Sequence, residues 1–152
     1  MGELVFKVSF WKFFVFVVGY SLLGDSIIIL PDWITTRRGG YASILSVLFF
    51  VVAVSFLLVA IVRQVWKVVV SASGIDGQNA WGFALTLTWQ EIKTTRPFNF
   101  GGLRYLRLYS SQTKRVMWLP LFLQDKKGFK AAVTQFAPPE NPLRRYLEAS
   151  TE

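Results

Sequence analysis

The stretch from Ala42 to Val62 carries no charged residue over 21 positions, and this constrains the fold more than any other feature of the sequence. A helix rises about 1.5 Å per residue, so about 20 apolar residues match a hydrocarbon core of about 30 Å. Arg63, Trp66 and Lys67 follow directly, a basic and aromatic flank that is typical of the end of a span. We therefore expect a transmembrane helix over about residues 42–62.

A second apolar stretch, from about Phe10 to Leu30, precedes this one. Lys12 near its start can extend to the membrane interface. No cleavage site of small residues follows Leu30, so a retained span over about residues 10–30 is favoured over a signal peptide. The short polar link of residues 32–41 suits a turn between antiparallel helices. The sequence thus predicts an integral membrane protein with a two-helix transmembrane hairpin over residues 1–64.

The orientation follows from the basic residues near the span ends. Lys7 and Lys12 lie at the N-terminal end of the first span, and Arg63 and Lys67 follow the second, against two arginines in the link. This bias places both termini on the cytoplasmic side, or on the equivalent side of an internal membrane. Asp25 lies within the first stretch, where an ionised carboxylate is costly, so it is expected near an interface or in contact with a partner helix.

The rest of the chain has a different character. Residues 63–152 hold 13 Lys and Arg against 6 Asp and Glu, which accounts for most of the net charge of +8. Strands are expected over 65–72, 83–89, 103–109 and 116–122, with a turn at 73–77, a loop at 97–102, and residues 91–95 as a continuation or a further strand. Pro120 indicates an edge or bulge position.

Two helices are expected at the C-terminal end. Asp125 can cap a helix in which Phe129, Ala132, Val133 and Phe136 share one apolar face. Two prolines stop it. Asn141-Pro142 then opens a second short helix in a Pro-rich tail over residues 138–152.

Three short sequence motifs follow one another along the chain: Gly74-Ile75 after the first strand, the segment from Trp89 to Ile92, and Leu119-Pro120 before the last helix. Together with two preceding spans, they resemble the bacterial pleckstrin-homology-like (YcxB-like) small membrane proteins over about residues 45–137. The resemblance implies an α+β membrane protein with a small antiparallel PH-like sheet or barrel over 65–137, closed by a C-terminal amphipathic helix. It implies no activity, and it places Trp89, Ile92 and Phe129 in the core.

The composition argues against an enzyme. The chain has no His and no Cys, which removes the commonest general base, the thiol nucleophile and the usual zinc ligands. There is no phosphate-binding loop and no dinucleotide fingerprint. Asp76, Glu91 and Asp125 are far apart and stand beside turn or cap positions. We expect no catalysis, no metal and no cofactor.

The basic residues are the remaining candidates for a site, because anionic lipid headgroups attract Lys and Arg near a membrane surface. The alternative is a solvated basic face without a specific ligand. Nucleic acid is not expected as a partner, since the aromatic residues alternate like core residues and the chain is tethered. The candidate lipid- or partner-binding residues are Lys114 and Arg115 at a hairpin tip, Lys126, Lys127 and Lys130 at a helix start, and Arg144 and Arg145 in the tail.

Two functions from different classes fit these features. The first is a non-catalytic, membrane-anchored accessory or assembly subunit of a larger membrane complex, with a protein partner in the membrane. The second is a free-standing PH-like module that binds anionic lipid or a soluble ligand at the membrane surface. A structural membrane protein that modulates envelope properties is a third hypothesis.

Overall fold

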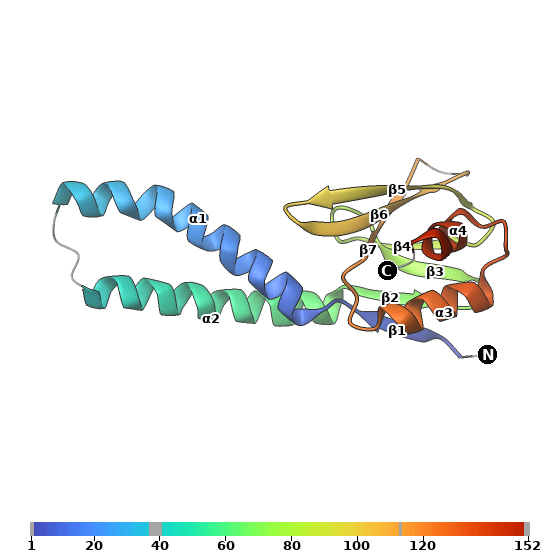
Figure 1. Cartoon of the computed structure of the whole chain (residues 1–152), viewed down its shortest axis with the longest axis horizontal. Coiled ribbons are helices and arrows are strands. Elements are labelled where there is room, and N and C mark those ends of the chain that lie inside the picture. Colours follow the sequence, from blue (N-terminus) through green and yellow to red (C-terminus); the bar gives the residue numbers. More distant parts are fainter. Residues whose placement is uncertain (1, 37–40, 113, 151–152) are drawn as a thin grey trace. The chain divides into compact units, whose positions relative to one another are not determined.

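The computed structural model describes residues 2–36, 41–112 and 114–150, apart from the side chains of residues 24–36, 41–44, 46 and 47. The chain divides into two compact units. One is helical and comprises residues 10–62, and the other joins the N-terminal residues up to Ser9 with the chain from Arg63 onward. Figure 1 labels the helices and strands of both units.

The helical unit consists of α1 (Phe10–Thr36) and the first 22 residues of α2 (Tyr41–Val65). Val51, Ser55 and Val59 of α2 are buried and lie four residues apart, so they form one narrow seam along the helix. The Phe56 ring of α2 packs against two rings of α1, with ring centroids 5.1 Å from Phe10 and 6.1 Å from Phe14. Aromatic contacts and a thin seam therefore hold the two helices together.

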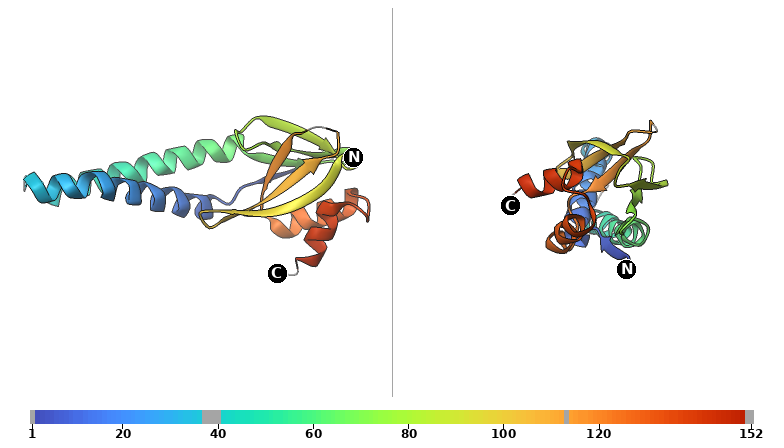
Figure 2. Two further views of the ribbon diagram at one scale, coloured as in Figure 1. Left: turned by 90° about the horizontal axis from the view of Figure 1, so that it is seen from above. Right: turned by 90° about the vertical axis from the view of Figure 1, so that its right-hand side faces the viewer.

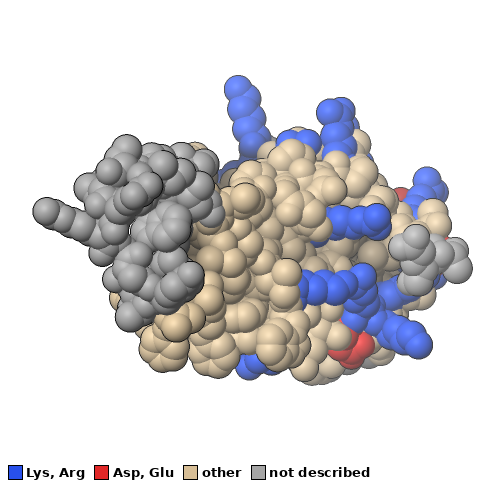
Figure 3. Space-filling view, turned by 60° about the vertical axis from the view of Figure 1, so that its left-hand side comes forward, with Lys and Arg blue, Asp and Glu red and all other residues tan. Residues whose placement is uncertain are grey.

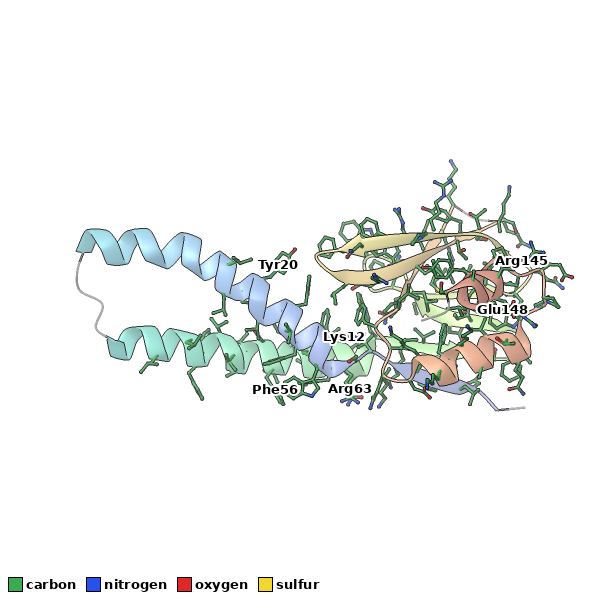
Figure 4. The ribbon with its side chains drawn as sticks, viewed as in Figure 1. Lys12, Tyr20, Phe56, Arg63, Arg145 and Glu148 are labelled. Carbon is green, nitrogen blue, oxygen red and sulfur yellow. The ribbon has the colours of Figure 1, made fainter. Side chains whose placement is uncertain are left out.

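The described outer surface of this helical unit is mostly apolar. Tyr20, for example, projects from α1 with 53% of its surface exposed (Figure 4). A helix with apolar residues on every face is normally buried in protein or in a membrane. The exposed large apolar residues of the unit are Trp11, Val15, Tyr20, Leu22, Leu23, Leu45, Leu48, Phe49, Phe50, Val52, Val54, Phe56, Leu57, Leu58 and Ile61.

The expected pair of membrane spans is not what the structure shows. Among the described residues, only the α2 segment Leu48–Val65 is long and apolar enough to cross a bilayer, a criterion of length and composition. The described apolar part of α1, Phe10–Leu23, is shorter. The predicted two-span hairpin over about 10–30 and 42–62 is therefore wrong, and so is the localisation derived from it, with two spans and both termini on one side.

The first β-sheet has four antiparallel strands in the order β1-β2-β3-β4. They are β1 (Leu4–Lys7), β2 (Lys67–Val70), β3 (Gly74–Gln78) and β4 (Ala84–Thr88). Strand β1 was not expected from the sequence. It pairs with β2 from Leu4 opposite Val70 to Lys7 opposite Lys67, and it buries Phe6. Four N-terminal residues thus complete a sheet whose other strands follow the helices in sequence.

The turn predicted over residues 73–77 is instead mostly strand. Only a tight connection separates β2 from β3, closed by a hydrogen bond from Ser71 N to Gly74 O over 3.0 Å. A Cβ atom at Gly74 would overlap the carbonyl oxygen of Leu87 on the neighbouring strand. The first glycine of the predicted turn is therefore required by close strand approach.

The second β-sheet has three antiparallel strands in the order β5-β6-β7: β5 (Ile92–Phe100), β6 (Leu103–Ser110) and β7 (Val116–Pro120). The loop expected at 97–102 shrinks to Gly101-Gly102, both with positive φ (55° and 91°), the geometry of a two-residue hairpin turn. Pro97 lies within β5, an edge strand, where proline is tolerated. The edge position predicted for Pro120 is confirmed, since β7 is the other edge.

The expectation of a single PH-like barrel is wrong, because the described strands form two separate sheets. The break falls after β4. The Glu91 carboxylate accepts hydrogen bonds from Thr88 N over 2.8 Å and from Thr88 Oγ1 over 2.9 Å. This local turn satisfies a backbone donor at the end of β4, so β5 starts a new sheet.

Two helices pack beside the sheets, α3 (Lys126–Phe136) and α4 (Pro142–Ala149), and they lie next to each other (Figures 1 and 2). Both predicted helices are confirmed, with Asp125 and Asn141 as their N-caps. Trp89, Ile92 and Phe129 are buried in the core, as expected. The core cluster also contains residues of both sheets and Leu143 of α4, so the tail packs on the same core as the strands.

Candidate functional site

The unit that joins the residues up to Ser9 with the chain from Arg63 onward contains both sheets, and we call it the β-rich unit. A surface hollow lies between two of its hairpin connections. One wall is the β3–β4 turn, and the other is the segment that enters β7 from β6. Its volume is about 560 Å³. We call it the tip hollow, and the residues that line it are Asn79, Ala80, Trp81, Phe83, Ala84, Leu85, Lys114, Arg115, Val116 and Trp118.

The β3–β4 turn is held by Asn79. Its side-chain Oδ1 accepts hydrogen bonds from Trp81 N over 2.9 Å and from Phe83 N over 3.0 Å. Its backbone N–H donates to Phe83 O, and its carbonyl accepts from Gly82 N. Gly82 has φ +81°, a conformation that L side chains rarely adopt. The backbone of the turn is therefore fixed by four hydrogen bonds and one glycine.

Two aromatic side chains on this turn are largely exposed to solvent. Trp81 is 85% exposed and Phe83 is 70% exposed. Fully burying a side chain such as Phe stabilises a fold by about 1.5–3 kcal/mol, and this gain is unrealised here. Contiguous exposed apolar surface can mark an interaction site, and these two residues lie on the same short turn.

The opposite wall is cationic. Lys114 and Arg115, both predicted from the sequence, are exposed and line the hollow together. None of the described residues that line it is acidic. The tip hollow therefore combines an aromatic wall with a positively charged wall.

The floor of the tip hollow includes Trp118 of β7, which belongs to an aromatic cluster. The Trp118 ring packs edge-on against Phe98 at a centroid distance of 5.0 Å and against Tyr105 at 5.7 Å. Arg107 places its guanidinium 4.6 Å from the centroid of the Phe98 ring. Burial raises the pKa of Tyr105 to about 12. This cluster makes the floor a packed aromatic surface.

The other predicted basic residues lie elsewhere. Lys126 and Lys127 are exposed in the first turn of α3, and Lys130 follows, half-buried, on the same helix. Figure 3 shows Lys and Arg side chains projecting from several places on the face it displays, with few acidic ones. The α3 lysines are therefore a separate group from the pair at the tip hollow.

The two predicted arginines of α4 differ from each other. Arg144 pairs with Glu148 at 2.8 Å and donates from Nη1 to the carbonyls of Thr134 and Ala137 over 3.0 and 3.1 Å. It thus ties α4 to the C-terminal end of α3. Arg145 is exposed (Figure 4). Asp25 lies within α1, but its side chain is outside the described residues, so its predicted partner contact stays a prediction.

Sequence reasoning missed Trp81 and misplaced Phe83. The sequence predicts a strand that begins at Phe83, but β4 begins one residue later and Phe83 is exposed. The available signal was Asn79 and Gly82 on either side of Trp81, since Asn and Gly are turn residues. Among the side chains that the structure describes, no group of three or more acidic residues is placed to hold a metal ion.

No family model, no curated protein and no solved structure matches this chain. The resemblance to YcxB-like proteins stays a prediction.

Proposed function

We propose that this protein is a non-catalytic interaction protein, anchored in a membrane by α2, that serves as an accessory or assembly subunit of a larger membrane complex. One observation carries the proposal. The segment Leu48–Val65 is long and apolar enough to cross a bilayer, and its large apolar side chains point outward from a narrow buried seam. Such a surface requires an apolar cover, and lipid or partner helices provide one.

The anchor is tested by alkaline extraction of membranes that contain the full chain. We expect the wild-type protein to stay in the membrane fraction. Leu57 and Leu58 are exposed near the middle of the segment, and each arginine there costs about 2.5–3.5 kcal/mol of insertion free energy. The double variant Leu57→Arg/Leu58→Arg should therefore be released. Gln64→Arg, at an exposed position near the segment's end, is the matched control and should stay. Release of the wild-type chain would overturn the proposal.

The subunit role is tested by the native mass of the tagged full chain after mild detergent extraction, with mass spectrometry of the proteins that travel with it. A discrete assembly well above the mass of one chain plus its micelle supports the role. A small particle that carries only lipid contradicts it.

The second candidate is a free-standing module that binds anionic lipid at the membrane surface. The observation that favours it is the tip hollow, where exposed Trp81 and Phe83 stand opposite Lys114 and Arg115. The small, lipid-only particle of the previous test would support this candidate.

A further inference from the structure

We propose that the tip hollow binds the phosphate-bearing headgroup of an anionic phospholipid, with Trp81 entering the interfacial layer of the bilayer beside it. This inference rests on the proposed function in one respect, that the chain is held at a membrane. It adds the place of contact, the lipid class and the residues that make the contact.

The charge of the hollow fits an anionic headgroup. Lys114 and Arg115 line one wall, and no described lining residue carries a negative charge. A basic side chain close to an anionic membrane surface strengthens binding about fivefold. Arg also presents several N–H donors in a planar fork that matches phosphate oxygens. The pair therefore places two positive charges beside the hollow, and these attract an anionic headgroup.

The aromatic wall fits the layer just below the headgroups. Trp is enriched at membrane interfaces because its ring is largely apolar and its indole N–H is polar. Trp81 is 85% exposed on a turn that Asn79 and Gly82 fix, so placing it in the interface orders little additional chain. Phe83, 70% exposed on the same turn, adds apolar surface.

The combination favours lipid over a soluble anion. A free phosphate would be satisfied by the cationic wall and would leave both aromatic side chains in water. A bilayer surface presents anionic and apolar groups in adjacent layers and so matches both walls at once. Because α2 leads into β2 with one intervening residue, the same chain holds the β-rich unit at high effective concentration near its anchor.

The absence of cysteine from the natural sequence allows a site-specific test. An environment-sensitive fluorophore is attached to full chains carrying Ala80→Cys, which lines the hollow, or Gln90→Cys, an exposed position beyond the other end of β4. The labelled chains are placed in nanodiscs of phosphatidylcholine alone or mixed with phosphatidylglycerol. We expect a blue shift, and quenching by brominated lipid, for the label at position 80 in the anionic discs, and neither for the label at position 90.

Variants then assign the response to residues. Lys114→Ala/Arg115→Ala should weaken the anionic-lipid response at least about fivefold, and Trp81→Ala should also reduce it. The matched control, Lys126→Ala/Lys127→Ala, removes the same charge from exposed positions of α3 and should leave the response unchanged. An equal loss in the control would overturn the assignment to the tip hollow.

Other results would also overturn the inference. One is that the label at position 80 shows neither a blue shift nor quenching while the chain remains in the disc. This result would leave the anchoring proposal intact. A second is an equal response in phosphatidylcholine alone, since charge would then be irrelevant. A third is an equal response to inorganic phosphate in detergent, which would assign the hollow to a soluble anion. Failure of the anchor itself appears separately, as release of the wild-type chain by alkali.

Discussion

The side-chain amide of Asn141 donates a hydrogen bond from Nδ2 to the backbone carbonyl of Trp89 over 2.7 Å, across 52 residues of sequence. Its Oδ1 accepts from Leu143 N over 2.9 Å and caps α4. One buried side chain therefore both starts the last helix and fixes it to the connection between the two sheets.

Replacing Asn141 should destabilise the β-rich unit. Asn141→Ala removes the cap and leaves the Trp89 carbonyl buried without that donor, so we expect a loss of about 2–4 kcal/mol in the free energy of unfolding. Asn141→Asp keeps a cap acceptor but still loses the donor, and should remain destabilised. Denaturant unfolding of the detergent-solubilised chain measures both variants. The exposed neighbour Glu140→Ala is the control, and equal stability of Asn141→Ala would contradict the assignment.

Gly74 should tolerate no side chain. A Cβ atom there overlaps the Leu87 carbonyl oxygen, and backbone cannot move aside as a side chain can, so Gly74→Ala should cost about 3 kcal/mol. Gly77→Ala is the matched control in the same strand. Its Cβ would lie 2.9 Å from the flexible Met117 Sδ, which can shift, so the loss should be smaller. The reverse ranking of the two denaturation midpoints would refute this reasoning.

The N-terminal strand should contribute strongly to stability. Phe6 is buried and packs edge-on against Phe129, with ring centroids 5.3 Å apart. Phe6→Ala should therefore destabilise the unit by about 3–5 kcal/mol. Val5 is 52% exposed on the same strand, and Val5→Ala should change stability by less than about 0.5 kcal/mol. If both substitutions behaved alike in denaturant unfolding, β1 would not pack as described.

Alanine substitutions at Arg144 and Arg145 should differ in their effect on stability, because Arg144 holds α4 to the end of α3 and Arg145 is exposed. Arg144→Ala removes charge-assisted hydrogen bonds to Thr134 O and Ala137 O, and a loss of about 2 kcal/mol is expected. Arg145→Ala, at the exposed neighbouring position, should change stability by no more than about 0.5 kcal/mol. Thermal unfolding followed by circular dichroism compares them, and a larger effect at Arg145 would reverse the roles.

Tyr105 should make the fold sensitive to alkali. Burial raises its pKa from 10.0 to about 12, so the hydroxyl ionises earlier in the unfolded chain than in the folded one. The free energy of unfolding should therefore fall as the pH rises from 10 to about 12. The ultraviolet absorbance of tyrosinate should show a late-titrating component that disappears in Tyr105→Phe. Titration unchanged by that substitution would argue against the raised pKa.

The sequence predicted the elements whose signals are local. Helix α3 followed from an apolar face at helical spacing behind the capping Asp125, and α4 from Asn141-Pro142. Leu85, Leu87 and Trp89 alternate and are buried, as expected. In these elements the caps and the side-chain periodicity are set by residues a few positions apart, so the chain alone contains the information.

Other features depend on partners that are distant in sequence. Strand β1 is too short to be recognised by itself. It forms because it pairs in antiparallel register with β2, about 60 residues later in the chain. The tip hollow likewise forms between two connections that are far apart in sequence.

The sequence by itself therefore determined the apolar segment of α2, the caps of the last two helices and the cationic pair Lys114 and Arg115. Only the tertiary structure decided that four N-terminal residues complete a sheet, and that Trp81 lines the same hollow as those cations. The physical reason is that helix caps and periodicity act over a few residues. Strand pairing and surface hollows arise between residues that only folding brings together.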